Sequence, residues 1–170
     1  MMGSDTLAIR PVRPEDVPLI CDIAVAAWRP IHECYREQLG EELYALWLTG
    51  WEERKASEVR GHAEAYPDWT LVAELPEGVV GFVTFRIGSD RASRLGHIGN
   101  NAVAPGHQGR SIGRMLYERA MEFMREEGVE WVELVTGLDD GHAPARRAYE
   151  RCGFRQAMPS VHYVKRIDEA

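Results

Sequence analysis

The apolar and polar positions of the chain follow two periods, one typical of strands and one typical of helices. Short stretches that alternate or run apolar predict strands at residues 7–12, 69–74, 79–87, 97–104, 131–136, 154–157 and 161–166. Apolar residues at helical spacing predict helices over residues 14–28, 112–127 and 143–151, and residues 41–64 are predicted to form one long helix or two short ones. This order of elements indicates a single mixed α/β domain over residues 7–167.

Glycines and prolines predict where these elements end. Pro30 is expected to break the first helix, and Gly50 and Gly61 are the expected weak points of the next. Residues 75–78 are expected to close a hairpin, and residues 88–94 to form a polar loop. The first five residues are expected to be a loose terminus.

Composition narrows the class of protein. The chain has 170 residues, 45% of them hydrophobic, and a net charge of −7, which suits one soluble domain and argues against a nucleic-acid partner. Its three cysteines lack a C-x-x-C spacing, which indicates a reducing cytoplasm and no disulfide framework. We expect no membrane segment, because no apolar run is long enough, and no metal site, because no two histidines have compact ligand spacing.

The most informative stretch is the junction of strand, turn and helix at residues 100–127. Pro105 ends the strand, and the helix is expected to begin near Ser111, a preferred N-cap residue. The first turn of a helix leaves N–H groups unpaired, and the helix dipole adds positive character, so a phosphate or pyrophosphate is the expected ligand. Gly109 and Gly113 allow an anion to approach the main chain, and Arg110 and Arg114 can add charge at the rim. The spacing fits neither the P-loop nor the dinucleotide pattern.

Two segments carry a resemblance to a known family. The run from Gln108 to Gly113, QGRSIG, resembles the acyl-CoA pyrophosphate loop Q/R-x-x-G-x-G/A of the GNAT superfamily of N-acetyltransferases, with Ser111 at a glycine position. Residues 142–154, HAPARRAYERCGF, resemble the superfamily's N-x-x-A-x-x-x-Y-x-x-x-G-F, with His142 in place of asparagine. The resemblance implies a GNAT-like acyl-CoA N-acyltransferase fold. Such a fold has a central mixed, mostly antiparallel sheet of about seven strands, helices on both faces, and a splay between the fourth and fifth strands.

The resemblance also implies how acetyl-CoA would be held as co-substrate. Pantetheine would pair with the strand end at Ala102 and Val103, and the Val103 N–H would polarise the thioester carbonyl. The alternative is that this strand is fully paired with its neighbour. His142 would hydrogen-bond to pantetheine or to its own loop. The pyrophosphate would meet Gln108, Gly109, Arg110, Ser111, Ile112, Gly113 and Arg114.

Acid and base candidates follow from residue type and position. Tyr149 is the candidate general acid, because a phenol stays protonated at neutral pH; the alternative is a core aromatic beside Phe154. His97 and Glu133 are the candidate bases, although such residues are usually surface or satisfied groups. Asn100 and Asn101 would order a water between the strands near the acceptor or simply bridge a β-bulge.

The acceptor is expected between the first two helices and the later strands. The candidate lining residues are Trp28, Tyr35, Trp47 and Trp51. The alternative is that they pack in the core, which is at least as well supported for Trp47. Glu33 and Glu37 are near enough to attract a cationic amine, although a solvated face is the alternative.

The function predicted from these features is a cytoplasmic N-acetyltransferase. It would act by direct transfer in a ternary complex on a primary amine of a small molecule or peptide. A non-catalytic acyl-CoA sensor of the same fold and another phosphate-using enzyme are the alternatives. The resemblance also allows a homodimer.

Overall fold

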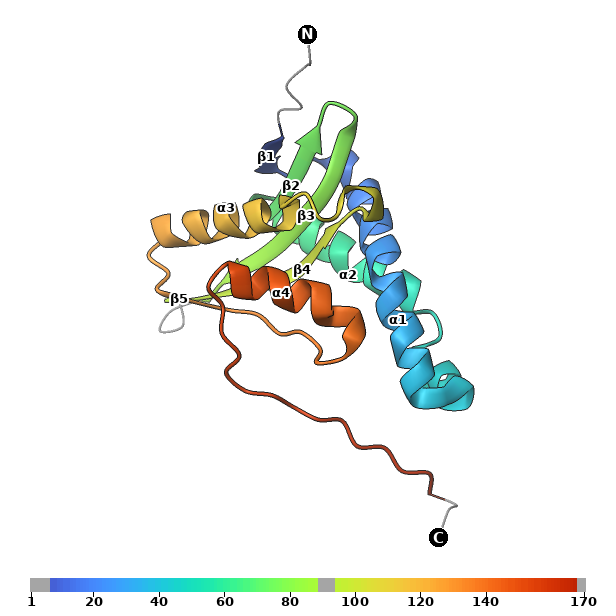
Figure 1. Cartoon of the computed structure of the whole chain (residues 1–170). Helices are drawn as coiled ribbons and strands as arrows, with labels where there is room; N and C mark the ends of the chain where they lie inside the picture. The colour runs from blue at the N-terminus through green and yellow to red at the C-terminus, as the bar shows by residue number, and fades with distance from the viewer. Residues whose placement is uncertain (1–6, 89–93, 168–170) are drawn as a thin grey trace.

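The computed structural model describes residues 7–88 and 94–167, which form five strands and four α-helices (Figure 1). The strands are β1 (Ala8–Pro11), β2 (Thr70–Leu75), β3 (Gly78–Ile87), β4 (Leu95–Val103) and β5 (Trp131–Glu133). The helices are α1 (Val17–Leu48), α2 (Trp51–Ala65), α3 (Ile112–Glu126) and α4 (Ala143–Arg151). The expected loop at residues 88–94 and the expected loose terminus lie largely outside the described residues.

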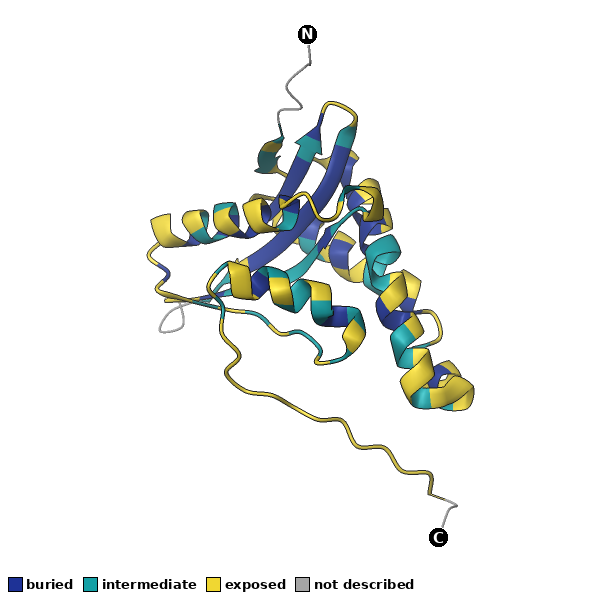
Figure 2. Cartoon of the chain, viewed as in Figure 1, coloured by how far each residue is buried: buried dark blue, intermediate teal, exposed yellow. Residues whose placement is uncertain are grey.

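The strands form one sheet in chain order, β1-β2-β3-β4-β5. Neighbouring strands are antiparallel except β4 and β5, which are parallel. The sheet buries both faces, and Figure 2 shows the buried residues concentrated in its central strands. One face packs against α3 and α4 through a cluster that includes Leu71, Val83, Phe85, Ile98, Leu116, Met124 and Tyr149. The other packs against α1 and α2 through Ile20, Ala24, Val59, Val72, Phe82 and Ala102.

The expected splay lies between β4 and β5. These strands pair only from Leu95 opposite Trp131 to His97 opposite Glu133. β4 continues to Val103, whereas β5 ends at Glu133. The second half of β4 therefore has no strand beside it on that edge among the described residues, and its outward backbone groups are left for another partner.

A β-bulge interrupts β4 next to the splay. Val83 lies opposite Asn101 but Phe85 lies opposite Ile98, so β4 carries one extra residue at positions 99–100. Gly99 suits this place, because a Cβ there would lie 2.9 Å from Thr84 Oγ1. The extra residue changes which side chains share a face of the sheet. Ile98 and Asn101 thus both face α3 and α4, while Asn100 faces α1 and α2.

The prediction of about seven strands was wrong in its count. Residues 154–157 and 161–166 form no strand, and the described C-terminal segment runs away from the sheet with exposed side chains (Figure 2). It touches the far half of α1 through an ion pair of Arg166 with Glu42 at 2.8 Å and a ring contact of His162 with Trp47. Alternating residues favour extended backbone, but a strand also needs a neighbouring edge, which local sequence does not supply.

The expected helix breaks were also partly wrong. Pro30 lies inside α1, which continues to Leu48 with a kink at Gly40, where φ is 75° and ψ is 160°. Burial of Ile31 and His32 holds the helix together just after the proline. The break between α1 and α2 falls at Gly50, in left-handed conformation as its residue type favours, whereas Gly61 stays helical.

Candidate active site

The N-terminus of α3 presents a row of unpaired backbone amides. Gly109 and Ser111 both have left-handed backbones, with φ of 77° and 62°. In the described part of the chain no group accepts a hydrogen bond from the N–H groups of residues 109–114, and the helix ladder begins with Met115 N–H donating to Ser111 at 3.1 Å. The expectation that Ser111 caps the helix was right in position only, because its side chain makes no capping hydrogen bond.

The loop that carries these amides is exposed and uncrowded. A Cβ added at Gly106 or Gly109 would meet nothing within 4 Å, and one at Gly113 would come no closer than 3.6 Å to Tyr117. Residues 108–111 are exposed. Arg114 lies one turn along and donates to Glu118 at 2.7 Å. The loop thus offers unpaired amides and a helix dipole to an anion.

The edge of β4 beside this loop is also open. Ala104 N–H donates to Val80 at 2.8 Å, so alternate β4 residues, including Ala102, turn their backbone groups to β3. Val103 therefore turns its N–H and C=O to the splayed side. Its carbonyl accepts from the Gln108 side chain at 3.1 Å, which ties the loop to the strand end.

Three polar side chains from β4, α3 and α4 lie together near the point where β4 and β5 separate. Tyr117 donates to Asn101 Oδ1 at 2.7 Å, and Asn101 Nδ2 lies 3.2 Å from the Tyr149 hydroxyl and 3.0 Å from the Gly99 carbonyl. The Tyr149 hydroxyl accepts from Asn101 Nδ2 and also lies 3.3 Å from Oδ1, a longer contact than the 2.7 Å contact that Tyr117 makes with the same oxygen. Burial raises the pKa of the Tyr149 phenol, so the hydroxyl stays protonated at neutral pH. Tyr149 also packs against Phe154, as the core reading expected, and its role as an acid stays a prediction.

His97 and Glu133 are brought together, but at the paired end of the two strands. His97 Nδ1 lies 3.3 Å from Glu133 Oε1, and the two side chains are 43% and 55% exposed. They are register partners across β4 and β5, just before the splay begins. The structure therefore places this pair at the mouth of the opening and in contact with water.

On the α1 and α2 side of the opening, the Lys55 ammonium contacts polar and aromatic side chains. Lys55 Nζ lies 3.8 Å from the Trp28 ring centroid, 2.7 Å from Glu58 Oε2 and 2.8 Å from Asn100 Oδ1. Asn100 thus faces the expected acceptor side, at the bulge. Sequence reasoning missed Lys55 and Glu58, because a Lys-Glu pair at i,i+3 is typical of a solvated helix face.

A buried pair stands at the start of α4. His142 Nδ1 lies 2.7 Å from Asp139 Oδ2, both side chains are 8% exposed, and the imidazole contacts the rings of Trp28 and Tyr35. Asp139 also caps the short 3-10 helix Asp140–His142 by accepting from the His142 N–H at 3.1 Å. Sequence reasoning missed Asp139, although an Asp three residues before a helix residue is an N-cap signal.

The remaining residues expected at the acceptor side lie elsewhere. Trp51 is buried and stacks on His32 with ring centroids 3.8 Å apart, so the core reading of this tryptophan holds. Trp47 is about half exposed beside His162. Glu33 and Glu37 are exposed on α1.

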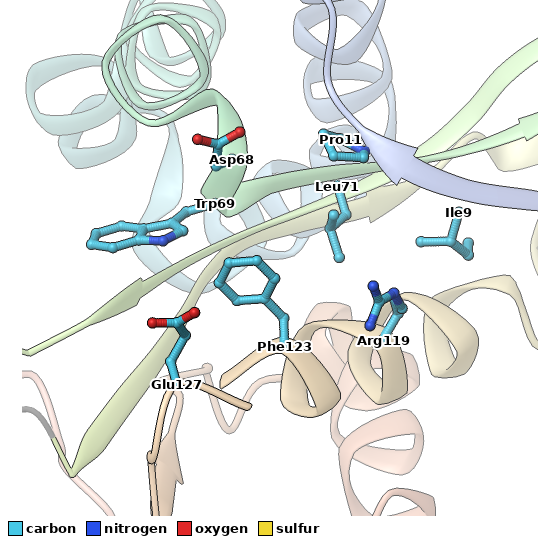
Figure 3. A pocket seen from close by; sticks show the side chains of 8 residues that line it. All are labelled: Ile9, Pro11, Asp68, Trp69, Leu71, Arg119, Phe123 and Glu127. Carbon is cyan, nitrogen blue, oxygen red and sulfur yellow. The ribbon is translucent and has the colours of Figure 1, made fainter. Parts of the chain in front are cut away.

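A pocket of about 390 Å³ lies away from these groups, between α3 and the β1–β2 edge of the sheet (Figure 3). It is lined by Ile9, Pro11, Asp68, Trp69, Leu71, Arg119, Phe123 and Glu127. Within residues 7–88 and 94–167 no cluster of three or more His, Cys, Asp or Glu side chains has metal-binding geometry. No helix in the same ranges has the length and apolar character of a membrane span.

Comparison with known proteins gives a consistent result. Streptothricin acetyltransferase from Streptomyces lavendulae is 50% identical over 54 residues, which are 31% of this chain and 26% of the relative. Mycothiol acetyltransferase from Sanguibacter keddieii is 35% identical over 101 residues, 58% of this chain and 31% of the relative. The chain thus spans about a quarter to a third of the length of these relatives.

Solved structures agree on the fold. A GNAT family acetyltransferase from Brucella melitensis, solved with acetyl-CoA, superposes with a TM-score of 0.58 at 23% identity, over 90% of this chain and 85% of that one. The sequence pattern of the acetyltransferase (GNAT) family matches residues 22–154, most of the chain. The open amide row, the splayed strands and this match lead to one conclusion: the chain belongs to the acetyltransferase (GNAT) family.

Proposed function

We propose that the chain is an acetyl-CoA-dependent N-acetyltransferase that moves the acetyl group to a primary amine by direct transfer in a ternary complex. The observation that carries the proposal is the row of unpaired amides at residues 109–114, next to the open Val103 edge. A pyrophosphate fits this row, because the N–H groups and the helix dipole both favour an anion. A Cβ added at Gly106 or Gly109 would meet nothing within 4 Å, and residues 108–111 are exposed.

When bound, acetyl-CoA supplies the thioester that carries the acetyl group. In the proposal the loop amides and Arg110 hold the diphosphate, and the outward backbone of Val103 receives the pantetheine end. The Val103 N–H then stabilises the negative charge that develops on the carbonyl oxygen, an effect worth about 3 kcal/mol at a single donor. The Gln108 contact to the Val103 carbonyl keeps the strand end and the loop in register.

Tyr149 acts in this proposal as the general acid that protonates the leaving sulfur. Its hydroxyl is held by the Asn101 amide, its contact as a donor to Asn101 Oδ1 is long at 3.3 Å, and burial raises the pKa of the phenol. A phenol with these properties keeps its proton until negative charge develops on the leaving sulfur.

We infer a small-molecule amine as the acceptor, rather than a peptide. The curated relatives are named for small molecules, streptothricin and mycothiol. The free state of Cys21, Cys34 and Cys152 supports a reducing cytoplasm as the working compartment.

The test uses a matched pair of variants at Gly113. An alanine Cβ there has only ordinary contacts, so Gly113→Ala should bind acetyl-CoA almost normally, whereas Gly113→Asp should bind it at least about tenfold more weakly. An aspartate in the first turn favours the helix, so thermal stability should not fall. Calorimetry with acetyl-CoA, and thiol release with a panel of amines, measure binding and transfer.

Equal affinities of the two variants for acetyl-CoA would place the diphosphate elsewhere. Tight binding without turnover on any amine would indicate a sensor, and binding of ATP alone would indicate another phosphate user.

A further inference from the structure

The proposed transfer requires a group that removes a proton from the acceptor ammonium. The structure offers His97 and also His142, whose surroundings differ. His97 is 43% exposed at the paired end of the strands. His142 is buried against α1, with Nδ1 held 2.7 Å from Asp139 Oδ2.

The hydrogen bond to Asp139 fixes the form of the His142 ring. A carboxylate accepts, so in the neutral form of the ring Nδ1 carries the hydrogen and Nε2 presents its lone pair. No hydrogen bond to Nε2 exists among the described residues. Nε2 is also absent from the buried unpaired side-chain atoms of the described chain, which are His62 Nε2 and His107 Nδ1. This nitrogen therefore keeps some contact with solvent, although His142 as a whole is only 6% exposed.

The ring lies on the acceptor side of the splay. Its centroid is 5.8 Å from that of Trp28, in an edge contact, and 6.0 Å from that of Tyr35. Trp28 also carries the Lys55 ammonium, which reaches Asn100 at the β4 bulge. One continuous set of contacts thus connects His142 to the strand edge where the acetyl group is proposed to sit.

Ionisable groups surround the ring on each element packed against it. They are Asp139 before the 3-10 turn, Arg146 on α4, His32 and Tyr35 on α1, and Lys55 on α2 behind Trp28. Arg146 donates to the carbonyls of Gly137 and Asp139, both at 2.6 Å, which holds the loop that carries the carboxylate.

We propose, on the basis of the acetyl transfer proposed above, that His142 is the catalytic base and Asp139 its positioning residue. His142 Nε2 takes a proton from the ammonium of a small primary amine, and Asp139 offsets the charge of the imidazolium. The freed nitrogen lone pair forms the new N–C bond. The C–S bond breaks with its electron pair going to sulfur, which takes the proton of Tyr149. The nitrogen then loses its second proton, which restores the Tyr149 phenol, and His142 releases its proton to water. The products are the amide, the free thiol and one proton.

The test compares four variants by the dependence of kcat/KM on pH. His142→Gln should lower kcat/KM about 100-fold at pH 7, and the deficit should shrink as the pH rises and the amine loses its proton unaided. Asp139→Asn should show a smaller loss, about tenfold, with the same trend. His162→Gln, in the exposed C-terminal segment, is the matched control and should behave as wild type. His97→Gln is the competing candidate and should keep the wild-type pH profile.

Several outcomes would overturn the assignment. If wild type transfers acetyl groups and His142→Gln keeps its rate and pH profile, the base is another group and the proposed function stands. If His97→Gln alone shows the predicted trend, the exposed pair is the base. If wild type binds acetyl-CoA but acetylates no amine in the panel, both proposals fail.

A spectroscopic measurement on the wild-type chain keeps the test independent of how the variants fold. Ring-nitrogen NMR should show neutral His142 with its hydrogen on Nδ1, and Asp139→Asn should weaken that preference. A hydrogen on Nε2 in the wild-type protein would overturn the proposal, because Nε2 would then have no lone pair for the ammonium proton.

Discussion

The two tyrosines that share Asn101 allow a sharp test of the acid assignment. Tyr117→Phe and Tyr149→Phe each remove one phenol that lies within hydrogen-bond distance of the same amide, at 2.7 Å and 3.2 Å. Both phenols are buried, so each variant should lose about 1 kcal/mol of unfolding free energy. The two substitutions are therefore matched in structural cost and differ in proposed chemistry.

The two variants should differ in kcat. Tyr149→Phe removes the proposed proton donor, and kcat should fall about 100-fold, equivalent to about 2.7 kcal/mol in the barrier. Tyr117→Phe leaves the donor in place but removes the stronger contact to Asn101 Oδ1, so this oxygen competes more strongly for the Tyr149 proton, which it already meets across 3.3 Å. That competition should cost only a few-fold in kcat.

The assay is thiol release with a saturating amine, combined with acetyl-CoA calorimetry and urea unfolding. Affinity for acetyl-CoA should change little in either variant. The acid role is wrong if Tyr149→Phe keeps kcat within about threefold of wild type, or if Tyr117→Phe loses as much turnover as Tyr149→Phe. A collapse of affinity with normal turnover per bound complex would instead make Tyr149 a binding residue.

Three further predictions concern stability. Gly96→Ala should lower the unfolding free energy by about 1–3 kcal/mol in urea titrations, because its Cβ would collide with core atoms of α3, whereas Gly61→Ala in open space on α2 should raise it by up to about 1 kcal/mol. Burial lowers the pKa of His32 to about 4, below its unfolded value near 6.5. Above pH 6.5 the ring is neutral in both states, but as the pH falls to 4 the unfolded state binds a proton first, and about 2–3 kcal/mol of unfolding free energy should be lost. His32→Phe should remove that loss in pH-dependent thermal unfolding. Arg10→Met should cost about 3 kcal/mol at pH 7, because Asp16 is buried and loses a 2.6 Å ion pair.

Each of these predictions has an outcome that contradicts it. Equal stability of the two glycine variants would mean that Gly96 is not in close contact with α3. An unchanged pH dependence in His32→Phe would assign the acid-sensitive step to another group. A double variant Arg10→Met/Asp16→Asn that loses as much as the two single changes added together would show that the pair is not coupled.

The ligand loop and the helix after it could be predicted from sequence, because their causes are local. The order of Gln108, Gly109 and Gly113 before an amphipathic run determines a left-handed turn and a helix start within a few residues. The same holds for α4, whose predicted bounds agree with the structure, and for the β2–β3 hairpin. The predicted C-terminal strands were wrong because a strand is completed by a neighbouring strand, which is often distant in sequence.

By itself the sequence therefore determined where unpaired backbone N–H groups are available to an anion, because the local backbone geometry follows from nearby residue types. Only the tertiary structure decided which side chains surround the proposed transfer site. The extra residue in β4 turns Asn101 toward two tyrosines and Asn100 toward Lys55, and the turn before α4 seats His142 and Asp139 against α1. These groups are 45 or more residues apart in the pairs that matter most, such as Lys55 with Asn100 and Asn101 with Tyr149. Their contacts arise from how the sheet and helices pack, which no local pattern of residues encodes.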